Sequence, residues 1–287
     1  MKPADARRLW QLLEPYHAAV YFAPETGHAY GDAGLKGYWM GYFASRSAAL
    51  GPVGPGAVTA LFFNFAPRMV YRALPDAWSF STPQRVLQAR WEVADAALRR
   101  LFGDVLDTKD VAEAADLGAE AVQHGDASGR PLFGAHRDLR VPDQAHLRLW
   151  HAATCLREHR GDGHVALLLG AGFDGCEANV MAAAAGVVPR DLQRERRGWT
   201  EDEWAAAHQR LRARGLVDEP GELTAMGVVE RDAIEARTDA LAVQPYEVLG
   251  DDGVARLVEL LEPLVRALLD SDSMPFPNPV GLPRPFG

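Results

Sequence analysis

Apolar residues recur at helical spacing at both ends of the chain. Residues 5–22 predict an amphipathic helix, with a kink at Pro15. The stripe on that helix consists of Leu9, Leu13, Tyr16, His17 and Val20. Residues 251–269 predict a second long helix, interrupted only by Pro263, whose apolar stripe indicates a core helix or a dimer seam.

Between these ends, the first half predicts more helices. Residues 34–50 and 56–74 read as two helices bounded by Gly-Pro pairs and rich in aromatic side chains, which must be buried against each other. Thr82 before Pro83 is a favourable helix start, and that helix extends to about residue 102. The polar, Gly- and Asp-rich stretch that follows reads as a linker.

The second half carries repeated helix-start signals. A helix beginning after Asp143 is predicted to stop at Gly161-Asp162-Gly163, and a short apolar helix follows it. Capping boxes at residues 174–177 and 200–203 start two more helices, which end near residues 186 and 215. Residues 215–224 then give two short extended pieces around a Pro-Gly turn, leading into a helix to about residue 241. This order predicts a winged helix with a β-hairpin wing.

Four parts of the chain follow from this reading. They are an aromatic-rich helical domain at 1–105, a linker at 106–142, a winged-helix domain at 143–245, and a last helix with an extended Pro-rich tail at 246–287. The fold class is therefore mostly α with a short hairpin in the second half.

Composition indicates the cellular compartment of the protein and limits the partners that it can bind. The 287 residues are 48% hydrophobic, yet no run approaches the roughly 20 apolar residues of a membrane span, and the charged N-terminus is unlike a signal peptide. Two cysteines without a CxxC pair predict no disulfide. We therefore expect a cytoplasmic protein that does not contact a membrane. The formal charge of −9 weighs against non-specific DNA binding, which depends on neutralising phosphates.

Two imidazoles and a carboxylate lie within six residues, at His159, Asp162 and His164. This set could ligate a metal ion or haem, or act in catalysis, with His17 as a third imidazole ligand. Positions five apart on one helix point about 140° away from each other, so a shared ion requires a break at the glycines. The alternatives are that Asp162 caps a following helix and that His17 is an ordinary core histidine.

Polar groups embedded among the first-half aromatics suggest a pocket for a planar ligand, whose candidate contacts are Tyr42, Arg46, Asn64 and Arg68. An ordinary core with arginine at its edge explains the same pattern. Residues 186–215 are basic, and Arg194, Arg196 and Arg197 are the candidates for DNA contact. The helix from Glu201 nevertheless opens with three acidic residues, and the turn at 218–222 is acidic too, which disfavours DNA.

Several motifs together resemble an actinobacterial family of helix-turn-helix proteins. They are LEPYHAAVYFAPE, FFNFAP with RALPDAW, LREHRGDGHVALL, RGWTEDEW with LRARGL, and PFPNPVGLP, and they span nearly the whole chain. The resemblance implies tandem helix-turn-helix or winged-helix-like halves and a cytosolic setting. It implies no catalytic residue and no cofactor.

The leading hypothesis is a protein that binds a metal ion, haem or small planar ligand between its halves, with oxidative chemistry as one use of that site. The alternative is a ligand-responsive transcription regulator that binds DNA as a homodimer. A structural or protein-binding module is the third hypothesis. The leading hypothesis depends on whether folding brings His17 together with His159 and His164.

Overall fold

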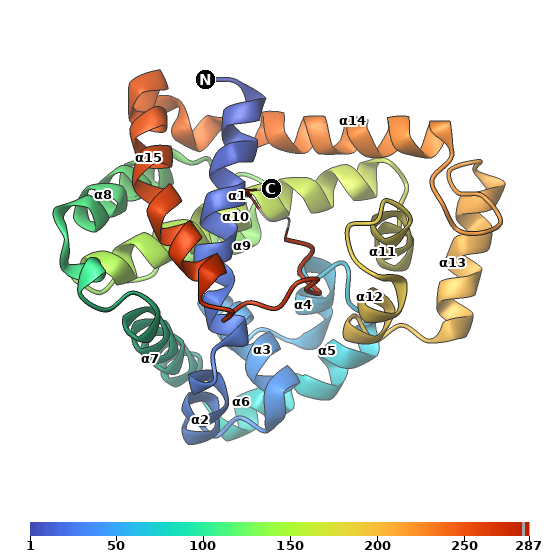
Figure 1. Ribbon diagram of the computed structural model, residues 1–287. Coiled ribbons are helices and arrows are strands. Elements are labelled where there is room, and N and C mark those ends of the chain that lie inside the picture. Colours follow the sequence, from blue (N-terminus) through green and yellow to red (C-terminus); the bar gives the residue numbers. More distant parts are fainter. Residues whose placement is uncertain (283–284, 287) are drawn as a thin grey trace.

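Helices form most of the structure, a computed structural model that describes residues 1–282 and 285–286 (Figure 1). The helices of the first half are α1 (Pro3–Phe22), α2 (Glu25–Asp32), α3 (Gly37–Ser47), α4 (Pro55–Leu61), α5 (Pro67–Ala73), α6 (Asp76–Phe80) and α7 (Pro83–Phe102). Those of the second half are α8 (Lys109–His124), α9 (Pro131–Arg137), α10 (Ala145–Gly170), α11 (Gly175–Ala184), α12 (Arg190–Arg196), α13 (Glu201–Ala213), α14 (Ala225–Leu241) and α15 (Gly250–Asp270). Three short 3₁₀ helices are η1 (Ala48–Leu50), η2 (Gly103–Asp107) and η3 (Gln244–Leu249).

The main hydrophobic core surrounds α10, the longest helix. It packs against α1, α7, α8, α9 and α14, and α15 covers α1 from the other side (Figure 1). Trp150, Tyr16 and Phe43 are the largest side chains that this core buries completely. The apolar stripe of α15 is buried in the same core, so within this chain it is a core face and not a free seam.

The predicted break of α10 is wrong, because the helix is continuous from Ala145 to Gly170. Asp162 does not cap a new helix at His164. Its carboxylate instead accepts a hydrogen bond from the backbone N–H of Phe133, 3.0 Å away, near the start of α9. Gly163 serves close packing, since a Cβ there would lie 2.6 Å from Nη1 of Arg130. The glycines therefore do not mark a helix end.

Residues 109–124 form α8, although the sequence pattern predicted a linker there. One face of α8 packs closely on α10 through small residues, namely Val111, Ala114, Ala115, Gly118, Ala121 and Val122. Ala and Gly contribute little to a hydrophobic pattern, which explains why this buried face was missed.

Residues 56–74 form two helices where the sequence predicted one. Pro67 begins α5, and a proline inside a continuous helix would remove a backbone hydrogen bond. The intervening residues 62–66 form a loop. Residues 34–50 likewise divide into α3 and the short η1. The loop at 62–66 lines a cavity between the two halves.

A second, smaller core lies between α11, α13 and the adjacent parts of α10 and α14. It contains Leu168, Phe173, Cys176, Val180, Met181, Trp204, Ala207, Leu211, Leu216, Val217 and Ile234. Four residues, 197–200, connect α12 to α13, and Gly198 adopts a positive φ of 77° in this turn. The predicted capping boxes at Asp174 and Thr200 are confirmed at the starts of α11 and α13. Two helices joined by so short a turn have the arrangement of a helix-turn-helix.

The predicted β-hairpin wing is wrong. Residues 215–224 contain one isolated antiparallel bridge, between Val217 and Leu223, and the described part of the chain has no β-strand. The extended pieces are too short to form strands, because Thr224 is already the N-cap of α14. The fold is therefore all-α, and the winged-helix prediction for the second half is not upheld.

After α15 the chain continues without helix and crosses to the neighbourhood of α11 and α12 (Figure 1). A Cβ at Gly281 would lie 3.2 Å from Val187 and 3.3 Å from Val188, which shows how closely this tail packs beside α11.

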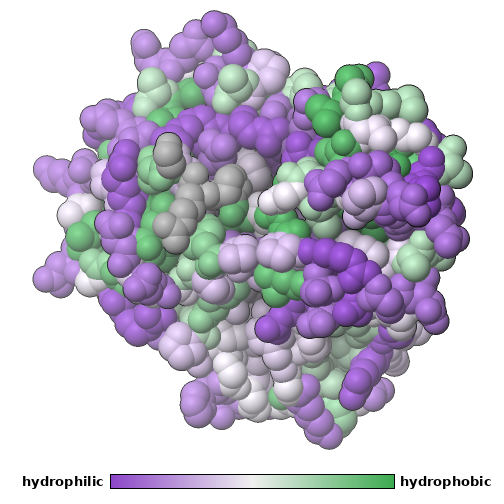
Figure 2. Space-filling view, turned by 45° about the vertical axis from the view of Figure 1, so that its right-hand side comes forward, coloured by the Kyte–Doolittle hydropathy of each residue, from purple (hydrophilic) through white to green (hydrophobic). Residues whose placement is uncertain are grey.

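The outer surface is mainly hydrophilic on the face that Figure 2 shows, with smaller hydrophobic groups between the charged residues. No single helix in the described ranges is long and apolar enough to cross a membrane. The one pair that passes such a test together, α10 and α11, is bent by 100°.

Candidate functional site

A cavity of about 700 Å³ lies between α1, α10, the loop at 62–66, α11 and the C-terminal tail. This volume is within the range of pockets that hold small organic molecules. Its lining joins both halves of the chain, from Arg7 in α1 to Leu282 in the tail. The site is therefore formed only by the folded whole.

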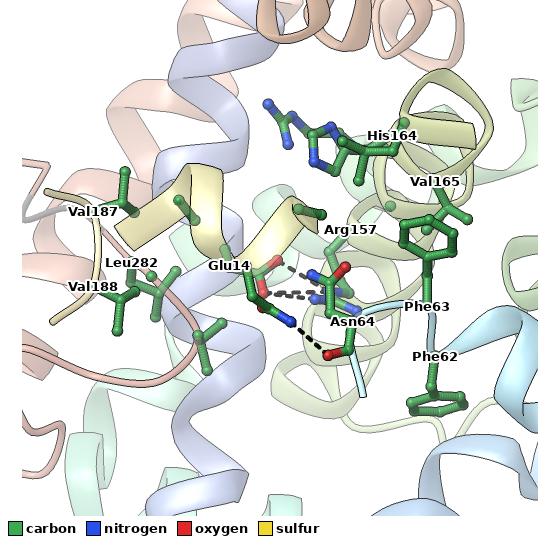
Figure 3. A pocket seen from close by; sticks show the side chains of 18 of the residues that line it. Glu14, Phe62, Phe63, Asn64, Arg157, His164, Val165, Val187, Val188 and Leu282 are labelled. Carbon is green, nitrogen blue, oxygen red and sulfur yellow. Dashed lines mark hydrogen bonds and ion pairs between the residues drawn. The ribbon is translucent and has the colours of Figure 1, made fainter. Parts of the chain in front are cut away.

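Apolar side chains form two facing walls of the cavity (Figure 3). One wall consists of Val187, Val188 and Leu282, and the other includes Phe63 and Val165. Between them, Glu14 of α1 and Arg157 of α10 meet at the base (Figure 3). The cavity thus combines apolar walls, one of which carries Phe63, with a charged floor.

The charged floor is a set of four residues that we call the interior network: Glu14, Arg46, Arg157 and Glu158. Arg157 donates from Nη2 to Glu14 over 3.0 Å and from Nη1 to Glu158 over 3.0 Å. Arg46 of α3 donates from Nη2 to Glu158 over 2.9 Å. Both carboxylates are almost completely buried. Burial raises the pKa of Glu158, but Arg157 and Arg46 outweigh that effect and hold the pKa well below its usual range.

Tyr42 connects this network to the helix-turn-helix. Its hydroxyl oxygen accepts a hydrogen bond of 2.9 Å from Nη1 of Arg46. Burial raises the pKa of Tyr42, but the positive charges of Arg46, Arg197 and Arg157 outweigh it and lower the pKa. Arg197 belongs to the turn between α12 and α13, so a residue of that turn also lines the cavity.

The three histidines proposed as metal ligands are not clustered. Both ring nitrogens of His17 are engaged, with Thr154 at 2.9 Å and Tyr21 at 2.8 Å. His164 lines the cavity, and its Nδ1 lies 2.9 Å from Oγ1 of Thr238. His159 does not line the cavity and instead meets the ring of Phe133 edge-on, with 4.9 Å between the ring centroids. Within the described ranges, no group of three or more His, Cys, Asp or Glu residues could hold a metal ion.

The three candidate catalytic residues differ in environment. Burial lowers the pKa of His159 to about 3, so its ring is neutral at pH 7. Burial raises the pKa of Asp162 to about 7, and this carboxyl group lines the cavity. Burial also lowers the pKa of His164. Asp162 and His164 therefore face the cavity, whereas His159 packs into the protein, and any catalytic role for them stays a prediction.

Three of the four candidate ligand contacts line the cavity, namely Tyr42, Arg46 and Asn64. Arg68 does not. It forms two hydrogen bonds of 2.7 Å with the carboxylate of Glu203 at the start of α13, and we call these two residues the surface pair. Both members are more than a third exposed, at 46% and 39%. Arg68 thus fastens α5 to α13 outside the cavity.

The three candidate DNA contacts also lie in different surroundings. Arg194 pairs with Glu201 at 3.2 Å, and Arg196 is exposed. Arg197 faces the interior, where its Nη2 donates to the backbone oxygen of Pro279 over 2.6 Å. Exposed Glu201 and Asp202 stand at the start of α13. Arg196 alone of the three is free to approach a nucleic acid.

Sequence reasoning did not identify Glu14, Arg157 and Glu158 as site residues. A signal was present, because Glu14 lies inside an otherwise buried run of α1. A charged side chain on a buried face needs a partner. Its partner Arg157 is 143 positions away in the chain, and local spacing cannot indicate such a pairing.

Comparison with known proteins gives one match. No curated protein and no solved structure matches the chain. A family model described as a helix-turn-helix family matches residues 6–275, which include both halves and all of the cavity lining except Val280, Gly281 and Leu282. The chain therefore belongs to this helix-turn-helix family.

Proposed function

We propose that this helix-turn-helix protein binds a small planar organic molecule in the cavity between its halves. The observation that carries the proposal is the cavity itself, which is about 700 Å³ in volume and has facing apolar walls above a charged floor. Buried polar atoms of its lining residues, Asn64 Oδ1, Arg46 Nε and Arg197 Nε, have no hydrogen-bond partner in the described part of the chain. Such atoms are rare in folded proteins because leaving them unpaired is costly, and a ligand could satisfy them.

The contacts around the loop at 62–66 support a link between this ligand and the helix-turn-helix. The backbone oxygen of Asn64 accepts hydrogen bonds from Asn179 of α11, at 2.7 Å, and from Trp199, at 3.1 Å. The backbone N–H of Ala66 donates to the backbone oxygen of Arg197 over 2.9 Å. A molecule that displaces this loop would therefore act directly on the turn before α13.

A panel of planar aromatic compounds tests the proposal. Binding compounds should raise the melting temperature, since a ligand at one hundred times its Kd stabilises the native state by about 2.7 kcal/mol. Ala182→Phe places a ring into the cavity lining and should weaken binding at least tenfold. Ala236→Phe, on the exposed face of α14, is the matched control and should leave binding unchanged. A panel without any binder, or equal affinity for both variants, would contradict the proposal.

A second candidate function is DNA binding through α12 and α13. Family membership and the four-residue turn favour it, since the second helix of such a pair is the one that enters the major groove. The exposed carboxylates of Glu201 and Asp202 oppose it at that end of α13. Gel-shift experiments with genomic fragments at low salt test this function. Arg196→Gln should lower the slope of log affinity against log salt by about one if Arg196 contacts phosphate, and the absence of any shift removes the candidate.

A further inference from the structure

We infer that the ligand carries a carboxylate group, and that Arg197 is the residue that binds it, beside Tyr42 and Arg46. This inference rests on the proposed function and names the chemical class of the molecule in the cavity.

The residues that line the cavity hold more arginines than carboxyl groups, whereas the chain as a whole is acidic. The chain as a whole has a formal charge of −9. Among the described residues of the lining, six arginines face four carboxyl groups. The arginines are Arg7, Arg46, Arg157, Arg160, Arg197 and Arg231, and the carboxyl groups are those of Glu14, Glu158, Asp162 and Glu235. Two carboxylates outside the lining, Asp232 and Asp239, pair with Arg231 and with Arg7 and Arg160, so the excess of positive charge is local and depends on which arginine lacks a partner. An unpaired positive charge in a low-dielectric cavity favours an anionic ligand.

Most of these arginines already have carboxylate partners. Arg7 pairs with Glu235 at 2.6 Å, and Arg160 pairs with Asp239 at 3.0 Å. Arg46 and Arg157 belong to the interior network. Arg197 forms no ion pair with any carboxylate of the described residues. Arg231 pairs with Asp232 at 3.6 Å. Of the six arginines in the lining, Arg197 is thus the one without a carboxylate partner among the described residues.

The surroundings hold the Arg197 guanidinium in place. Its Nη2 donates 2.6 Å to the backbone oxygen of Pro279, and the group lies 4.4 Å from the ring centroid of Phe65. Its Nε has no hydrogen-bond partner among the described atoms. Burial, together with the charges of Arg46 and Arg157, lowers the pKa of Arg197 and outweighs the opposite effect of Tyr42, although arginine stays charged in proteins. A carboxylate would offset the repulsion between Arg197 and the charges of Arg46 and Arg157. Its two oxygens match the planar fork of a guanidinium.

The apolar walls determine the rest of the ligand. Phe62 and Phe63 line the cavity on the side of the 62–66 loop, opposite Val187, Val188 and Leu282 (Figure 3). An aromatic wall that faces an aliphatic one suits a planar apolar ring system more than a sugar or a peptide, whose polar groups would lose water without compensation. The ligand class is therefore a planar, apolar carboxylic acid.

Two probes of the same shape test the inference. We would measure the binding of 2-naphthoate and of neutral 2-naphthamide to the full chain by isothermal titration calorimetry at pH 7.5. The wild-type protein should bind the carboxylate at least tenfold more tightly than the amide, a difference of about 1.4 kcal/mol. Arg197→Gln should abolish this preference while leaving the affinity for the amide unchanged, and Arg197→Lys should retain part of it.

Arg196→Gln is the matched control, because it removes a neighbouring arginine that is exposed and does not line the cavity. It should preserve the preference for the carboxylate. Equal affinity of the wild-type protein for both probes would overturn this inference but leave the proposed function standing. The same holds if Arg197→Gln weakens the binding of both probes equally. If neither probe binds and the wider panel also contains no binder, the proposed function fails as well, so the two failures can be told apart.

Discussion

The interior network and the surface pair use the same chemistry in opposite surroundings. Glu14 and Glu158 are 3% and 2% exposed beside their arginines, whereas Arg68 and Glu203 are 46% and 39% exposed. Charges in a low-dielectric interior interact strongly, but each one is very costly if it loses its partner. Exposed pairs are weakened by water and salt. We therefore expect the interior network to maintain the cavity and the surface pair to contribute little to stability.

The largest effect should come from removing Glu158. Glu158→Ala leaves Arg46 and Arg157 partly unpaired inside the protein, and breaking a buried pair in this way costs about 3–5 kcal/mol. Urea unfolding of the variant measures this loss of unfolding free energy. A double-mutant cycle with Arg46→Ala should give a coupling energy well above that of any exposed pair. A loss below about 1 kcal/mol, the upper end for exposed pairs, would mean that the network is better solvated than its burial indicates.

Asp162 differs from both sets, because it is a buried carboxyl group without an ion pair to arginine among the described residues. Burial raises its pKa to about 7 in the native state, against about 3.9 in the unfolded chain. The native state therefore keeps the proton to higher pH. Its stabilising contribution is fully present below about pH 4 and is lost as the pH rises through 7.

Asp162→Asn should remove this pH dependence. Between pH 5 and pH 8 the wild-type protein should lose about 3 kcal/mol of unfolding free energy relative to the variant. Urea titrations at several pH values give this difference. Asp138→Asn replaces an exposed carboxylate and should run parallel to the wild type. Parallel profiles for Asp162→Asn would show that the carboxyl group titrates normally.

Gly161 and Gly163, on either side of Asp162, test whether one continuous helix places Arg157 and Glu158 in the interior. Within continuous α10, a Cβ added at Gly161 would have no neighbouring atom closer than 3.8 Å, so Gly161→Ala should raise stability by about 0.5–1 kcal/mol. Gly163→Ala should instead destabilise the protein by about 1–3 kcal/mol, because its Cβ meets Arg130. Thermal unfolding of both variants checks the signs. A destabilising Gly161→Ala would favour the helix break that the sequence suggests.

The sequence was informative where helix ends are chemically marked. Thr82, Asp174 and Thr200 are confirmed as N-caps by their hydrogen bonds to backbone N–H groups. The sequence was misleading at Gly161 and Gly163, because glycine both ends helices and allows the close approach of a neighbouring residue. Asp143 is not the start of α10, whose N-cap is Gln144.

The site was only partly predictable for a related reason. Tyr42, Arg46 and Asn64 could be singled out as polar groups among aromatics, and they line the cavity. Residues that meet from distant segments, such as Glu14 and Arg157, carry no local pattern that identifies their partner. Histidine spacing was equally uninformative, because His17 finds Thr154 and Tyr21 as its partners instead of the other imidazoles.

The smallest effect should come from the surface pair. Arg68→Gln removes a bidentate contact with Glu203, yet exposed pairs contribute about 0.2–1 kcal/mol. Neighbouring Arg68 lowers the pKa of Glu203 to about 2, so the contribution is present near neutral pH and declines as the pH falls below about 4.5. Raising the salt concentration to about 1 M should abolish the difference between wild type and variant, because the Debye length falls to about 3 Å. A loss that persists at this salt concentration would mean that Arg68 contributes through its contact with the backbone of Gly198. The surface pair would then differ from the interior network in its hydrogen-bond geometry more than in its exposure to solvent.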